Sequence, residues 1–168
     1  MQPANKLERI LEEYKKVFKK YDFEFTEMSD EKFLWIRSSL QFEKFENMKV
    51  SLEAVIDRNC AAVQISLHLF GGLPEDKIHL IDETVGILNG ISILGHLYRD
   101  TSENSLFYIS GIFLGPLDFN TTEFEKVFRA LMGVGLEHLN VIRKALEPGA
   151  DYRALLGDHL ARCGLGPV

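Results

Sequence analysis

The sequence predicts an α+β fold: an antiparallel sheet in the order α-βββ-α-ββ-α, with an extra C-terminal helix. Three observations carry this prediction. Apolar residues at helical spacing open the chain, alternating apolar and polar residues follow, and two strand-like segments lie between two later helical patterns. The 168 residues fit a single domain, residues 1–168, in which residues 150–168 form a C-terminal helical extension.

The first helix is predicted over about Asn5 to Tyr21. Glutamate and lysine residues cover one side of it, and the acidic residues come first and the basic ones last, as the helix dipole favours. The opposite side carries seven apolar residues at helical spacing, which predicts that it packs on a core. These residues are Leu7, Ile10, Leu11, Tyr14, Val17, Phe18 and Tyr21.

Three strands are predicted next. Phe33–Ser38 is short and rich in aromatic and β-branched residues, and whether the strand extends further stays open. Met48–Asp57 and Ala61–Phe70 alternate apolar and polar side chains, which is typical of antiparallel strands with one face on a core. Arg58-Asn59 suits a two-residue turn between them, because asparagine tolerates positive φ.

A helix and a hairpin are predicted after the third strand. Pro74 is followed by two acidic residues, as in the first turn of a helix, and Asn89-Gly90 resembles a C-cap. Ile91–Arg99 and Leu106–Leu114 are strand-like and are joined by a polar stretch. Gly95 and Gly111 interrupt these two strands and mark either bulges or close backbone packing.

A long helix and a short one are predicted at the end of the chain. Asn120 or Thr121 is a good N-cap for the long helix, and Pro148-Gly149 ends it. Gly133 and Gly135 weaken its middle by about 1 kcal/mol each relative to alanine. The segment Asp151–Arg162 reads as a short amphipathic helix.

Charge and hydropathy argue against two classes of partner. The net charge is −6 and the pI is about 5.4, whereas binding to nucleic acid or to an anionic membrane surface needs clustered Lys and Arg. No apolar run approaches the roughly 20 residues of a membrane span, and residues 1–13 lack an apolar signal core. We therefore expect a cytoplasmic protein that engages neither nucleic acid nor membrane.

The sequence contains no recognisable catalytic or metal-binding motif. No phosphate-binding loop, nucleophile elbow or zinc spacing is present, so we expect no cofactor, no metal and no enzymatic activity. His79, Asp82 and Glu83 share one helix face and suit either a weak metal or acid–base cluster or, preferably, a solvated surface. Cys60 and Cys163 are too far apart for a disulfide framework, and we expect free thiols.

One arrangement of strand residues keeps an enzymatic or small-molecule-sensing alternative open. His68 and His96 both lie in predicted strands of one sheet, and Cys60 lies near the start of the third strand. If these side chains converged, they could form a site that no linear motif reveals. Scattered surface histidines would argue against this alternative.

The order of the elements resembles the type III secretion chaperone-like fold and, within it, the YbjN-like family. The resemblance spans about Leu7 to Leu146 and is strongest over Val85–Phe128, where a helix, a glycine-containing strand, a polar turn, an aromatic strand and a capped helix follow one another. Secretion chaperones of this fold are small, acidic, cytoplasmic homodimers that hold an extended segment of a partner protein. The resemblance carries over no site residue, because YbjN-like proteins lack a defined biochemical activity.

These observations lead to the hypothesis of a non-enzymatic protein-binding module, chaperone-like or regulatory, that forms a homodimer and engages another protein. Apolar side chains on the less buried face of the sheet are the candidate binding residues: Phe33, Trp35 and Val55. The competing interpretation is that these residues pack against a helix or against the dimer partner. A purely structural subunit is the third possibility.

Overall fold

The computed structural model describes residues 3–58, 62–69, 72–113 and 121–165. Within these ranges the chain forms four α-helices, six β-strands and two short 3-10 turns. In order they are α1 (Pro3–Lys20), β1 (Thr26–Ser29), β2 (Phe33–Phe42), η1 (Glu43–Phe45), β3 (Met48–Asp57), β4 (Ala62–Leu69), η2 (Glu75–Lys77), α2 (Ile78–Ile91), β5 (His96–Asp100), β6 (Ser105–Phe113), α3 (Thr121–Ala145) and α4 (Tyr152–Arg162).

The six strands form one antiparallel sheet in the order β1-β2-β3-β4-β6-β5. The predicted α+β fold class is confirmed, and β3 has the predicted bounds. The open question of the length of β2 is also settled, because β2 pairs with β3 as far as Phe42 opposite Met48. The predicted turn residue Asn59 and the predicted cap Asn120 lie outside the described residues.

Strand β1 is an addition that the sequence pattern did not predict. It has four residues, and three of them are exposed. Because no face of so short an edge strand is fully buried, its sequence carries no clear apolar alternation. Its position is set by pairing with β2, where Met28 lies opposite Trp35.

The prediction that Asn89-Gly90 ends the middle helix is wrong, because α2 continues to Ile91. The strand predicted from Ile91 accordingly begins only at His96. Asn89 instead uses its side chain to bind the next strand: its amide nitrogen donates to the Leu97 carbonyl at 2.9 Å, and its amide oxygen accepts from the Leu97 N–H at 2.6 Å. A residue type that commonly caps helices therefore serves here to tie α2 to β5.

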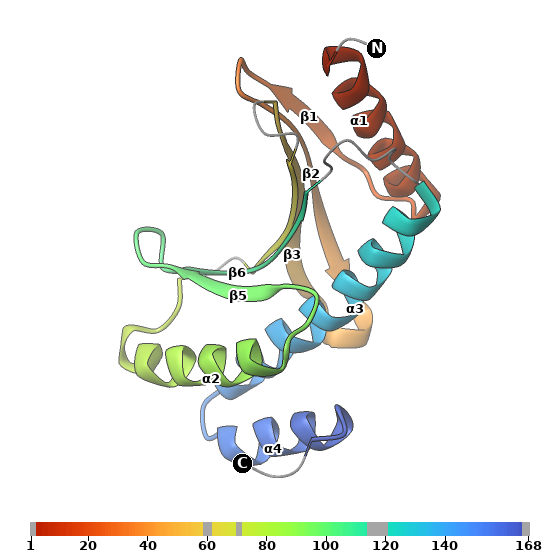
Figure 1. Ribbon diagram of the computed structural model, residues 1–168. Coiled ribbons are helices and arrows are strands. Elements are labelled where there is room, and N and C mark those ends of the chain that lie inside the picture. Colours follow the sequence, from red (N-terminus) through yellow and green to blue (C-terminus); the bar gives the residue numbers. More distant parts are fainter. Residues whose placement is uncertain (1–2, 59–61, 70–71, 114–120, 166–168) are drawn as a thin grey trace.

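The sheet is strongly curved, and the helices lie on its convex side (Figure 1). Helices α1 and α3 cover the part formed by β1–β4, while α2 lies beneath the β5–β6 hairpin. Alternate residues of β2, β3 and β4 point into the core on this side, for example Ile36, Leu52 and Leu67, which are fully buried. None of the helices in the described ranges has both the length and the apolar character that a membrane span requires.

Two glycines allow close approach around the buried side chain of Tyr108. A β-carbon at Gly135 of α3 would lie 2.6 Å from the Tyr108 ring and 2.7 Å from Leu67, and one at Gly95 would lie 2.6 Å from the Ile109 carbonyl oxygen. Two reasons were predicted for a glycine at position 95, a bulge or close backbone packing. The structure shows close backbone packing. Gly111 instead pairs in regular register with Gln64.

Helix α4 packs on α3 through apolar residues and a pair of buried histidines. Leu156 and Leu160 belong to the same hydrophobic core as the sheet residues. His138 Nδ1 lies 3.0 Å from His159 Nε2, and both side chains are buried. Burial lowers the pKa of His138 to about 4, and burial together with the nearby Arg162 charge also lowers the pKa of His159.

The first prediction compares two glycines of α3. Gly135→Ala should destabilise the protein by about 1–3 kcal/mol, because the added methyl group would overlap the buried Tyr108 ring and overpack the core. Gly133→Ala, whose β-carbon would meet nothing within 4 Å, should stabilise the protein by about 0.5–1 kcal/mol through helix propensity. Urea unfolding of both variants measures the difference, and equal effects would contradict the close helix–sheet contact.

The second prediction concerns acid stability. The unfolded chain takes up protons near pH 6.5, whereas the folded chain keeps His138 neutral down to about pH 4. The free energy of unfolding should therefore fall between about pH 6.5 and pH 4, by at most about 3 kcal/mol for this residue. The double variant His138→Gln/His159→Gln should show a flatter profile in urea unfolding, and the exposed His79→Gln control should follow the wild type.

Candidate functional site

The three predicted binding residues lie together on the concave face of the sheet. Trp35 of β2 and Val55 of β3 are cross-strand partners, and Phe33 follows two residues before Trp35 on the same face. All three side chains are half-buried. They line a shallow hollow of about 300 Å³, together with Arg37 and Glu53. That these residues bind a partner stays a prediction.

An ion pair forms one wall of this hollow. Arg37 and Glu53 are cross-strand partners next to Trp35 and Val55, and Arg37 Nε lies 2.6 Å from a Glu53 carboxylate oxygen. Neither residue is among the binding residues predicted from the sequence, although the apolar–polar alternation of Met48–Asp57 puts Glu53 on the same face as Val55. The hollow thus combines an apolar floor with one paired, partly exposed guanidinium group.

The concave face continues across the sheet toward the other edge strand. In the register of the strands, Ser51, His68, Phe107 and Tyr98 form one row on this face. The His68 ring stacks on Phe107 with 4.0 Å between ring centroids, and burial lowers the pKa of His68. Tyr98 on β5 is 50% exposed, so the row ends in an accessible aromatic side chain.

No helix within the described part of the chain covers this face, which opens to the left in Figure 1. The competing interpretation of Phe33, Trp35 and Val55 was packing against a helix or against a dimer partner. The described residues show no helix on them, and packing against a dimer partner stays open. Ser51 on this face is nevertheless buried.

The structure does not bring together the histidines of the alternative hypothesis. His68 lies against Phe107, whereas His96 is exposed on β5 opposite Ile109, and strand β6 separates their two strands. Cys60 lies outside the described residues. His68 and His96 therefore do not converge into a pair that could act as acid and base.

The three polar residues that share one face of α2, His79, Asp82 and Glu83, do not contact a common partner. Asp82 accepts two hydrogen bonds from Arg99 of β5, at 2.7 and 2.9 Å, and this interaction lowers the pKa of Asp82. Glu83 accepts a hydrogen bond from the Tyr152 hydroxyl of α4, and His79 is exposed. Across the described ranges, no group of three or more His, Cys, Asp or Glu side chains is arranged to hold a metal ion.

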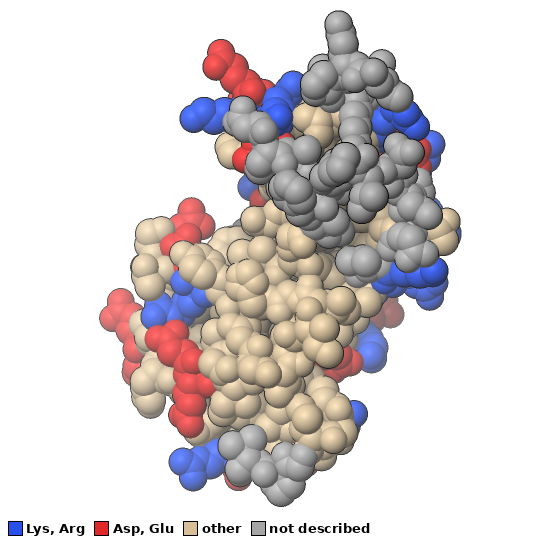
Figure 2. Space-filling model, viewed as in Figure 1, with Lys and Arg blue, Asp and Glu red and all other residues tan. Residues whose placement is uncertain are grey.

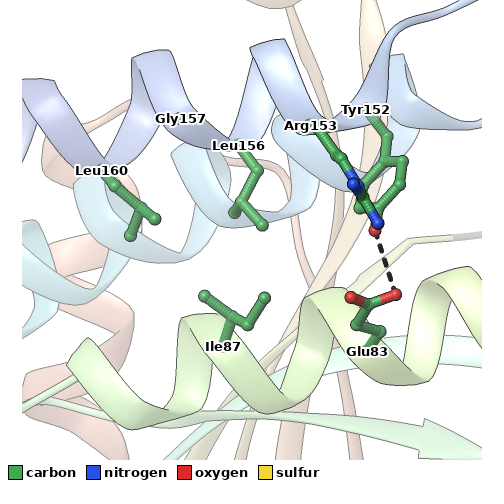
Figure 3. A pocket seen from close by; sticks show the side chains of 7 residues that line it. All are labelled: Glu83, Ile87, Tyr152, Arg153, Leu156, Gly157 and Leu160. Carbon is green, nitrogen blue, oxygen red and sulfur yellow. Dashed lines mark hydrogen bonds between the residues drawn. The ribbon is translucent and has the colours of Figure 1, made fainter. Parts of the chain in front are cut away.

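A groove between α2 and α4 was not predicted from the sequence. Figure 3 shows Ile87 of α2 pointing toward Leu156 and Leu160 of α4, with the Glu83–Tyr152 hydrogen bond closing one end. The groove has a volume of about 310 Å³. Helical periodicity predicts that the apolar faces of α2 and α4 are buried. It does not predict that a groove remains between these two faces.

Comparisons with known proteins support the fold. No protein-family model matches the sequence, and no curated protein matches it significantly. The structure is similar to YbjN from E. coli, described as a candidate transcription regulator, with a TM-score of 0.51 and 10% identity over 79% of this chain and 87% of YbjN. It is also similar to a chain of the ExsC–ExsE complex, with a TM-score of 0.41 and 13% identity over 68% of this chain and 78% of the other.

The likeness to YbjN is one of fold, because 10% identity says nothing about shared chemistry. It confirms the resemblance that the order of elements carries. The chain therefore has a YbjN-like α+β fold, in which six antiparallel strands and four helices are seen among the described residues.

Proposed function

We propose that the protein is a non-enzymatic protein-binding module, chaperone-like or regulatory, whose concave sheet face holds an extended segment of another protein. One observation carries the proposal: Phe33, Trp35 and Val55 gather around a hollow on a sheet face that no described helix covers. An apolar hollow with a polar wall is typical of a surface that another protein covers.

An extended partner segment suits this face better than a folded one. A concave sheet presents side chains in rows about one strand spacing apart, so alternate side chains of an extended chain can enter the hollow at Trp35 and reach the aromatic row at Phe107. The backbone edges of β1 and β5 border the sheet on either side and offer further hydrogen-bonding groups.

The enzymatic or sensor alternative has less support. It rested on convergence of His68 and His96, and these side chains lie on strands separated by β6. A binding protein needs no such convergence, because apolar contact and shape supply its affinity. We accordingly propose no catalytic residue and no cofactor.

Homodimerisation in the cytoplasm forms the second part of the proposal. The turn between α2 and β5 carries Ile93, which is 96% exposed, and Leu94, which is 39% exposed. Figure 2 shows uncharged side chains across the middle of the lower half of the molecule, with acidic and basic side chains along its left margin. Such exposed apolar side chains are commonly covered by another subunit.

The third prediction tests the concave face. A tagged wild-type protein should capture a partner from native lysate, and the double variant Trp35→Asp/Val55→Asp should lose most of this capture, because two carboxylates would have to be desolvated in the hollow. Lys16→Asp on the exposed side of α1 is the matched control, since it changes the net charge by the same amount. Circular dichroism and urea unfolding establish that the variants are folded.

Two results would count against this proposal. Equal capture by the wild type and the double variant would show that the partner binds elsewhere. Loss of capture in the Lys16→Asp control would show that net charge, and not the hollow, determines binding.

The fourth prediction tests the dimer. Light scattering after size-exclusion chromatography should give twice the monomer mass for the wild type, and Ile93→Asp should shift the protein to the monomer, because the interface would bury an unpaired carboxylate. Leu165→Asp, at an apolar residue of similar exposure to Leu94 but near the end of the chain, serves as the control. A wild-type monomer at all concentrations would contradict the proposed dimer.

A further inference from the structure

An aromatic cleft lies on the convex side of the molecule, away from the concave face. It is bounded by α3, by the segment that follows α1 and by the end of β2 with η1, and its volume is about 460 Å³. This volume falls in the range of small-molecule sites, about 300–1,000 Å³. Five aromatic rings line most of it: Tyr21, Phe23, Phe42, Phe45 and Phe128.

The walls of this aromatic cleft are held in place by contacts among the rings and by one hydrogen bond. Tyr21 and Phe128 have ring centroids 6.1 Å apart, and Phe42 and Phe45 have centroids 6.5 Å apart. The Tyr21 hydroxyl donates to Glu125 of α3 at 2.9 Å, which fixes the ring at the mouth. The cleft is therefore formed before any ligand arrives.

Gly133 leaves the floor of the cleft open. It lies on an exposed part of α3, and a β-carbon added there would meet nothing within 4 Å. Helix propensity disfavours glycine at such a position by about 1 kcal/mol relative to alanine. Unlike Gly135, which the contact with Tyr108 requires, Gly133 has no packing reason in the described part of the chain. Its effect on the structure is to keep space available inside the cleft.

The rim of the cleft has a surplus of one positive charge. Lys44 pairs with Glu137 at 3.1 Å, so these two charges offset each other. Arg129 also lines the cleft, and its positive charge acts on the nearby Glu125, whose carboxylate Lys20 binds at 2.7 Å. The Arg129 guanidinium group is exposed beside the aromatic rings of the cleft. Its planar donors fit a carboxylate in bidentate geometry.

We propose that this cleft is a binding site for a small apolar monocarboxylate, whose hydrocarbon part lies among the aromatic rings over Gly133 and whose carboxylate pairs with Arg129. The single surplus charge matches a monoanion better than a phosphate, which carries more charge and would need additional donors. The site shares no residue with the concave hollow, so it is independent of the protein-binding function proposed above.

The fifth prediction uses octanoate, octan-1-ol and octylammonium as probes of equal chain length. Isothermal titration calorimetry of the wild-type protein should show saturable octanoate binding about tenfold tighter than octanol binding, since one charge-assisted contact contributes about a factor of ten. Octylammonium should bind most weakly. Amide chemical shifts of α3 residues around Gly133 should move on titration with octanoate.

Matched variants separate the two parts of the site. Gly133→Leu should abolish binding of octanoate and octanol alike by filling the cavity, whereas Gly133→Ala should keep measurable binding although it gains the same kind of helix propensity. Arg129→Gln should reduce octanoate binding to the octanol level. Lys16→Gln, which removes one charge from a residue that does not line the cleft, should leave octanoate binding unchanged. Trp35→Asp/Val55→Asp should also leave it unchanged.

Several outcomes would overturn the proposal. These are the absence of saturable octanoate binding to the wild type, octanoate binding by Gly133→Leu at wild-type affinity, or equal binding of octanoate and octylammonium. Loss of partner-protein capture in Gly133→Leu, with octanoate inactive, would likewise overturn it and would assign the cleft to a protein side chain. The three octanoate results do not depend on whether the concave face binds a partner.

Discussion

The buried side chain of Tyr108 joins the sheet to the elements around it. Its ring lies against Gly135 of α3 and Gly95 before β5, and its hydroxyl shares a 2.8 Å hydrogen bond with the Ser92 side chain at the end of α2. It also contacts His138 edge to face, and His138 in turn holds α4 through His159. The depth at which α3 sits on the sheet, and with it the position of α4, therefore depends on this one residue and two glycines.

Burial of a single face of the sheet has a functional consequence. The core side chains of β2, β3 and β4 pack against α1 and α3 on the convex side. On the concave side, no helix of the described ranges covers Trp35 and Val55. In contrast to a sheet with helices on both faces, this arrangement leaves an apolar surface whose burial by a partner would be favourable. The proposed binding function follows from this difference between the two faces of the sheet and requires no catalytic residue.

Most of the fold could be predicted from the sequence because its elements are strongly patterned. The bounds of β3 and the apolar face of α1 follow directly from periodicity. Strand β1 could not be predicted, because four mostly exposed residues carry no pattern and depend on pairing with β2. The wrong C-cap prediction at Asn89 has a different reason. Asn89-Gly90 is a local signal for the end of a helix, but the Asn89 side chain binds the backbone of Leu97 and the helix continues. The candidate residues of the concave face were predicted from alternation, whereas the aromatic cleft and the buried histidine pair arise from segments far apart in the chain.

The central proposal is that a partner protein covers the concave face, and the single tryptophan of the chain, Trp35, lines the hollow on that face. Acrylamide quenching of Trp35 fluorescence, measured with the wild-type protein alone and with a purified partner that contains no tryptophan, tests this claim most directly. We predict a blue-shifted emission and a severalfold lower quenching constant in the complex, because the indole would leave water. An unchanged emission and quenching constant in a complex that demonstrably forms would contradict the account.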